Sequence, residues 1–297
     1  MMHTRTGAVV THVVVLSSIT ALIALCMVYP FLPGAYDGLS VGISLMAQVF
    51  GIVGLPLVPL GGLWFAYEFW RRARRRNNRP ARGGGFVFAV ITAIVATLAV
   101  AAVAVIGAAT SGLALGLLAF VLWLYAVFRF RLTVKRLKDP ERQVMSLMPL
   151  YLMVIPVAAL LLQLALAAPV TQMSRDRAIA TSAEIIEDIE AYHARHGSYP
   201  GSLFATWPDY APGVVGIAQY HYVAQGDAYN LVFQQPRFLL DDIGVREFVV
   251  YNPLDQQRII SHTSWILLLS PAEARRSPGW FASRNAPHPH WKYFWFD

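Results

Sequence analysis

Long stretches without a charged side chain dominate the first part of the chain. They run over residues 6–36, 38–67, 83–128 and 143–174. A helix that crosses a bilayer needs about 20 apolar residues, so each stretch can supply one. The third, on the order of 70 Å long as a single helix, can supply two if it turns at the small residues 108–112. The pattern predicts five spans, at about 8–29, 41–67, 86–107, 113–130 and 145–168.

The second predicted span carries helix-disturbing residues at Pro56, Pro59, Gly61 and Gly62. Two alternatives stay open for its shape: a kinked continuous helix or a re-entrant segment. A broken helix could also expose carbonyls to a solute, which gives the hypothesis of a small-molecule carrier. No charged residue accompanies the break, which favours a packing kink. The polar side chains inside the spans are interpreted as partners in local hydrogen bonds: His12, Gln48 and Gln163.

Beyond residue 168 the pattern changes to that of an amphipathic helix over residues 174–196. Its apolar positions recur close to the 3.6-residue period, and Pro169 is expected to separate it from the fifth span. Gly197 can take the left-handed conformation that ends a helix, and Tyr199-Pro200 prevents its continuation. The predicted apolar stripe consists of Ala178, Ile179, Ala183, Ile185, Ile186, Ile189 and Tyr192.

Alternating segments after this helix predict a small antiparallel sheet. Residues 220–225 and 229–234 flank a short glycine-containing turn, which is typical of a hairpin. A second hairpin is expected from residues 246–251 and 257–262, and a further strand from 265–269. Asp241-Asp242 is interpreted as a turn cap.

The last residues of the sequence are unusually aromatic. They follow an expected irregular connector over residues 271–289. An edge strand of the sheet is one interpretation of the tail, and a segment that contacts a membrane surface or a protein partner is the other. The residues concerned are Trp291, Tyr293, Phe294, Trp295 and Phe296.

Composition and charge agree with a membrane protein. The chain is 56% hydrophobic and 14% charged, against roughly 25% charged in soluble domains. Basic residues gather in the loops after the second and fourth spans, which the positive-inside rule places in the cytoplasm. The N-terminus is then cytoplasmic and residues 169–297 are extracytoplasmic, so the basic charge indicates topology and no nucleic-acid partner. The cytoplasmic charge anchor is Arg71, Arg72, Arg74, Arg75 and Arg76.

Candidate chemistry is sparse. The sequence contains neither a catalytic motif nor a zinc motif of known spacing, so no catalytic residue and no cofactor is expected. Histidines outside the spans still raise the hypothesis of a metal-binding exterior domain. The candidate ligands are His193, His196, His288 and His290.

The end of the amphipathic helix carries a family resemblance. Tyr192, Gly197, Tyr199-Pro200 and Leu203 form the pattern Y-x4-G-x-Y-P-x2-L. This pattern resembles the stretch after the long N-terminal helix of type II secretion major pseudopilins and related type IV pilin-like proteins. The resemblance covers roughly residues 145–262 and implies that the Tyr-Pro loop folds against a small antiparallel sheet. Before Met145 the family's leader site and glutamate are absent, so the resemblance concerns the shape of the domain.

The expected fold is an all-α membrane domain of about five transmembrane helices (1–168) followed by an extracytoplasmic pilin-like α+β domain (169–297). The expected function is that of a multi-pass protein of a bacterial inner membrane, a non-catalytic binding or assembly component of the envelope. Its expected partners are the lipid bilayer and an envelope protein or further copies of the chain. The carrier and the metal-binding exterior domain are the alternatives.

Overall fold

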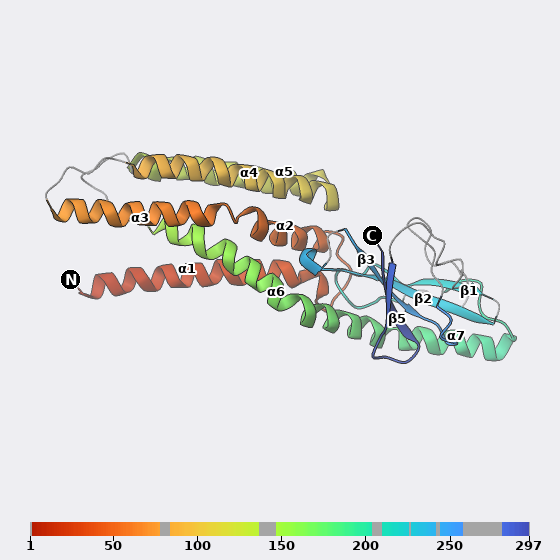
Figure 1. The fold of residues 1–297 in the computed structure, drawn as a ribbon. Helices are drawn as coiled ribbons and strands as arrows, with labels where there is room; N and C mark the ends of the chain where they lie inside the picture. The colour runs from red at the N-terminus through yellow and green to blue at the C-terminus, as the bar shows by residue number, and fades with distance from the viewer. Residues whose placement is uncertain are drawn as a thin grey trace. The chain divides into compact units, whose positions relative to one another are not determined.

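The computed structural model describes residues 2–77, 84–136, 147–203, 210–225, 227–241, 244–257 and 281–296. In this part the chain is mostly helical, with a five-stranded antiparallel sheet towards the C-terminus (Figure 1). It divides into two compact units. The first consists of Met1–Met27 and Val41–Ala165, and the second of Val28–Ser40 and Leu166–Asp297.

Helices make up the first unit. Four of the described helices are long and apolar enough to cross a membrane, and the number becomes five if the bent pair α2–α3 is one span. The prediction of several membrane-capable apolar helices is confirmed at this level. The helices are α1 (Met2–Val28), α2 (Ser40–Val53), α3 (Leu57–Arg76), α4 (Gly85–Ser111), α5 (Leu113–Arg136) and the first part of α6 (Met148–Thr181).

Small residues let α4 and α5 pack closely as a hairpin. The turn between them is Gly112, whose φ of 95° is accessible to glycine. A Cβ atom on Gly116 of α5 would lie 2.3 Å from the carbonyl oxygen of Ala104 on α4. Close approach through small residues is the usual way in which apolar helices associate in lipid. The turn thus falls inside the expected residues 108–112, but only at Gly112, because α4 continues to Ser111.

The second predicted span is two helices that meet at 50°. The bend lies at residues 54–56, where the Gly54 N–H still donates to the Phe50 carbonyl at 3.0 Å and helix α3 begins at Leu57. Pro59 falls in the first turn of α3, where a missing N–H costs no intrahelical hydrogen bond. The break at Pro56 is therefore real, while Pro59 is accommodated.

Helix α6 passes through Pro156 and Pro169 without ending. The expected break at Pro169 is therefore wrong. A proline inside a helix removes one N–H and costs about 3 kcal/mol, and the helix continues because Ala178 and Ile179 are buried in the core of the second unit. The interruption comes at Ser182, whose hydroxyl donates to the Ile179 carbonyl at 2.7 Å. Helix α7 (Ala183–His196) follows.

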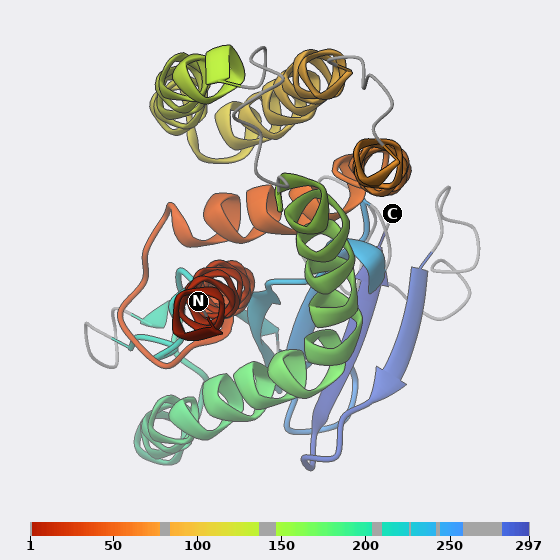
Figure 2. The same cartoon turned by 90° about the vertical axis from the view of Figure 1, so that its left-hand side faces the viewer.

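The sheet of the second unit has the order β1-β2-β3-β5-β4, and all neighbours are antiparallel. The end of α6 and helix α7 pack on one face of it (Figure 2). That face forms the main core, which includes Ile185, Ile189, Tyr229 and Leu231. The strands are β1 (His221–Gln225), β2 (Ala228–Gln235), β3 (Arg246–Tyr251), β4 (Phe281–Asn285) and β5 (Trp291–Phe296).

The first predicted hairpin is confirmed as β1 and β2, with Gln225 opposite Ala228. The second is wrong, because β3 pairs with β2 on one side and β5 on the other. The expected partner of β3 and the strand at 265–269 lie in residues 258–280, outside the described ranges. Strand β4 occupies part of the expected irregular connector, and β5 is an inner strand instead of an edge strand.

Residues 28–40 join the second unit although α1 and α2 flank them in the chain. Pro33 and Val214 form an isolated antiparallel bridge. The Gly34 N–H donates to the Gly213 carbonyl at 3.0 Å, and the Val215 N–H to the Leu32 carbonyl at 2.9 Å. The division of the sequence after residue 168 does not include this contribution.

Candidate functional site

The Tyr-Pro turn is built around the end of α7. Gly197 has a φ of 73°, and its N–H donates to the His193 carbonyl at 2.8 Å, so it ends the helix as predicted. Tyr199 and Leu203 pack against the main core. Pro200 is buried, and its carbonyl accepts a hydrogen bond from the Tyr222 hydroxyl at 2.8 Å. The turn is thereby fastened to strand β1.

Four tyrosines and one carboxylate meet beside this turn. We call Tyr199, Tyr222, Tyr229, Tyr251 and Glu190 the tyrosine cluster. The ring of Tyr229 lies 5.0 Å from that of Tyr199, 5.5 Å from that of Tyr222 and 5.8 Å from that of Tyr251, measured between centroids. The Tyr199 hydroxyl lies 3.5 Å from both oxygens of Glu190. Helix α7 supplies the carboxylate and the sheet supplies three of the rings.

Burial and negative charge both oppose ionisation in this cluster. Burial raises the pKa of Tyr229, and the neighbouring Tyr251 and Glu190 raise it further. The pKa values of Tyr199 and Tyr222 are raised chiefly by burial as well, and Glu190 adds to both shifts. The hydroxyls therefore stay protonated in the folded unit at neutral pH. The cluster supplies aromatic surface and hydrogen-bond donors.

Raised tyrosine pKa values predict a loss of stability in alkali. Because these pKa values lie above the unfolded value of about 10, the unfolded chain releases its protons first, and stability falls as the pH rises beyond that point. Tyr229→Phe removes one hydroxyl that has to ionise and is expected to move the unfolding midpoint to higher pH. The measurement is circular dichroism of the detergent-solubilised chain alongside tyrosinate absorbance. An unchanged midpoint in Tyr229→Phe contradicts the prediction.

The candidate metal ligands have different neighbours. The His193 ring stacks on Tyr199 and the His196 ring on Tyr192, with centroids 4.1 and 4.0 Å apart. His288 contacts Asp176 at 2.8 Å, and His290 contacts Asp255 at 3.1 Å. Within the described ranges no group of three or more His, Cys, Asp or Glu side chains is arranged to hold a metal ion.

The aromatic tail contributes to both faces of the sheet as strand β5. Trp291 and Tyr293 are buried in the main core beneath the helices. Phe294 is buried on the opposite face with Val232 and Val250, and Phe296 packs against that group. Most of this aromatic surface is thus used within the unit, and a contact of the tail with a partner or a membrane stays a prediction.

A buried ionic network, which the sequence patterns did not indicate, lies under β5. The Glu247 side chain on β3 is 0% exposed. It accepts two hydrogen bonds from the Arg175 guanidinium, both at 2.6 Å, and one from the Trp295 indole at 2.8 Å. The Arg237 guanidinium lies 3.7 Å away. Only the proximity of α6, β3 and β5 in space reveals this set, because its members are far apart in the chain.

The polar side chains His12, Gln48 and Gln163 of the predicted spans form hydrogen bonds within the first unit. The Gln163 amide on α6 donates to the Gln48 amide oxygen on α2 at 3.2 Å, and Gln48 donates to Ser44 at 2.9 Å. His12 hydrogen-bonds the Tyr151 hydroxyl at 2.8 Å. The interpretation of these residues as hydrogen-bond partners is supported, although the bonds of Gln163 with Gln48 and of His12 with Tyr151 join different helices, and only that of Gln48 with Ser44 is local.

The arginine-rich segment forms the end of α3. Arg71 is buried and lies 3.0 Å from the Glu68 carboxylate. Arg72 and Arg76 are exposed, and the Arg74 guanidinium lies 4.3 Å from the centre of the Trp70 ring. Arg72, Arg74 and Arg76 are therefore exposed positive charges at this helix end, and their role as a cytoplasmic anchor stays a prediction.

No family model, no curated protein and no solved structure matches this chain. The fold and the residue contacts consequently carry the functional argument.

Proposed function

We propose that this chain is a multi-pass protein of a bacterial inner membrane that carries its second unit on the extracytoplasmic side, where that unit binds an envelope protein. The role is non-catalytic, an anchor that presents a binding or assembly domain. The course of helix α6 is the observation that supports this proposal best. Its first part belongs to the apolar helical unit, and its last turns place Ala178 and Ile179 in the core of the sheet unit.

The arrangement of the second unit supports a pilin-like domain. A long helix ends at Gly197, the Tyr-Pro turn packs on the core, and an antiparallel sheet lies against the helix. The exposed face of α7 is the surface on which we place the partner. It presents Glu184, Glu187, Ala191 and Arg195.

The orientation follows from the charge distribution. The exposed arginines at the end of α3 favour the cytoplasm. Each further crossing reverses the side, so crossings by α4, α5 and α6 support an outside position for α7.

One labelling experiment tests both side and partner. The single cysteine is first removed by Cys26→Ser, and Glu187→Cys then introduces a thiol on the exposed face of α7. Spheroplasts with an intact inner membrane are treated with a membrane-impermeant maleimide that carries a photoreactive group. We expect labelling without permeabilisation, and one discrete adduct with an envelope protein after irradiation.

Arg72→Cys in the same background is the matched control and should react only after permeabilisation. Reaction of Arg72→Cys in intact spheroplasts, with Glu187→Cys protected, would reverse the proposed topology. An adduct between two copies of the chain, or none from Glu187→Cys and Arg195→Cys, would overturn the assignment of an envelope protein to this face.

The alternatives remain predictions. A carrier needs a broken span, and α2–α3 is bent. The cavity beside the bend, however, is lined without a charged side chain among the described residues. A metal-binding exterior domain has no further support, because the four candidate histidines have separate neighbours.

A further inference from the structure

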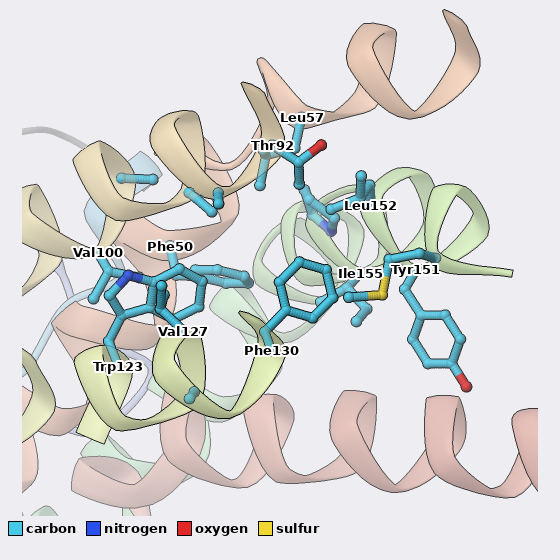
Figure 3. A pocket seen from close by; sticks show the side chains of 16 residues that line it. Phe50, Leu57, Thr92, Val100, Trp123, Val127, Phe130, Tyr151, Leu152 and Ile155 are labelled. Atoms are coloured by element: carbon cyan, nitrogen blue, oxygen red, sulfur yellow. The ribbon is translucent and has the colours of Figure 1, made fainter. Parts of the chain in front are cut away.

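A cavity of about 340 Å³ lies among the helices of the first unit (Figure 3). This volume falls in the range of sites that hold small ligands, roughly 300–1,000 Å³. Its inner wall is buried and includes Leu57, Thr92, Ala96 and Pro156. The cavity is partly open, and Ala126 of α5 both lines it and is exposed.

The cavity results from two features of the sequence. Phe50 and Leu57 line it from the two sides of the α2–α3 bend, and Pro156 of α6 faces that bend, since a Cβ on Gly54 would lie 3.3 Å from the Pro156 ring. On α4 the lining is made by small residues such as Ala96. Bent helices and short side chains leave a space that ordinary packing would fill.

The lining accepts hydrocarbon and offers little to a polar solute. The Trp123 indole donates to the Thr97 hydroxyl at 3.0 Å, and the Tyr151 hydroxyl is engaged with His12. The Thr92 hydroxyl is buried and has no hydrogen-bond partner in the described part of the chain. An apolar cavity of this kind excludes water, so its occupant is an apolar chain that brings at most a single polar group to Thr92.

The position of the cavity along the helices indicates the source of that chain. It involves residues 92–100 of α4 and 148–156 of α6, about 12 Å of each helix and most of a roughly 15 Å leaflet. Residues 148–156 begin α6, residues 92–100 lie in the half of α4 nearer its start at Gly85, and exposed Arg129 adjoins Phe130 in the lining. Basic residues at this depth attract anionic headgroups.

We propose that the cavity binds one acyl chain of an anionic phospholipid from the leaflet on the arginine-rich side. The headgroup lies at the helix ends near Arg129, and the chain extends along α4 and α6 to the bend. The lipid completes the packing of the bent helices. This inference rests on the membrane insertion proposed above and is independent of the exterior partner.

Photo-crosslinking in vesicles tests the inference. The full chain is reconstituted in phosphatidylethanolamine vesicles that contain phosphatidylglycerol with a diazirine in one acyl chain, and the modified peptides are mapped by mass spectrometry. We expect crosslinks to cluster on residues 92–100, 123–130 and 148–156. Ala96→Phe should displace at least two methylene groups of the acyl chain from the inner wall. At about 0.8 kcal/mol per buried methylene, this displacement corresponds to about a tenfold loss of crosslinking.

Ala126→Phe at the opening should reduce crosslinking as well, whereas Ala102→Phe is the matched control, because Ala102 is exposed on α4 and does not line the cavity. Crosslinks that spread evenly over the exposed helix faces would overturn the inference. Equal crosslinking by a diazirine phosphatidylethanolamine would also overturn it, as would recovery of an isoprenoid lipid from the purified chain. Resistance of every variant to carbonate extraction shows that membrane insertion itself holds. Extraction of the unmodified chain would refute insertion and this inference together.

Discussion

Glu247→Ala is expected to destabilise the second unit by about 3 kcal/mol, because it leaves the Arg175 guanidinium, whose side chain is only 15% exposed, without its carboxylate. The loss includes two hydrogen bonds from Arg175 and one from the Trp295 indole. These contacts join α6, β3 and β5, so their removal should loosen the centre of the sheet. Hydrogen exchange of the β2 and β3 amides in the full detergent-solubilised chain measures the effect.

Two further variants serve as controls for this result. Glu187→Ala removes an exposed carboxylate from α7 and should change stability by less than about 0.5 kcal/mol. Arg175→Met combined with Glu247→Met removes the charges of that pair and should recover part of the loss, since apolar pairs can replace buried ion pairs, while Arg237 still loses its neighbouring carboxylate. Unchanged exchange in β3 of Glu247→Ala would show that the network contributes little.

Gly216→Ala is expected to detach residues 28–40 from the second unit. A Cβ at this position would lie 2.6 Å from both the Cβ and the carbonyl oxygen of Pro30, and 2.8 Å from the Pro236 ring. The same Pro30 carbonyl accepts the Gly216 N–H at 2.7 Å, so the backbones cannot separate without losing that bond. Overpacking of this kind costs about 1–3 kcal/mol. Faster hydrogen exchange at Gly34 and Val215 reports the detachment.

Gly201→Ala is the matched control for this substitution. A Cβ on Gly201 meets no atom of the described residues within 4 Å, so alanine there should leave stability unchanged or raise it by about 0.4–1 kcal/mol. Equal exchange protection at Gly34 in both variants would show that the close approach of Gly216 to Pro30 does not hold the segment.

Local patterns predicted the helical features of this chain well. The uncharged stretches indicated the membrane-capable helices, and Gly197 marked the end of α7, because both depend on neighbouring residues. The predicted helix break at Pro169 was wrong, since the effect of a proline depends on whether tertiary packing holds the residues beyond it. The buried positions Ala178 and Ile179 provide that packing.

The long-range pairing of strands could not be predicted from the sequence. The register of β1 and β2 follows from a short turn, but β3 pairs with β5 across residues 252–290. Strand β4, Phe-Ala-Ser-Arg-Asn, has no clear alternation and looks like a connector until β5 lies beside it. Glu247 likewise reads as a surface charge on a strand, and only its burial against Arg175 gives it a structural role.

The contribution of residues 28–40 to the second unit has a consequence for the order of folding. Translation produces this segment before α2, whereas its partners Gly213 to Gly216 follow α7. The Gly34 N–H and the Leu32 carbonyl therefore lack these partners while the intervening helices are synthesised. The unit closes only when the two distant segments meet, a non-local step of the kind that slows folding. Completion of the second unit is thus a late event that requires everything between the two segments to have been synthesised.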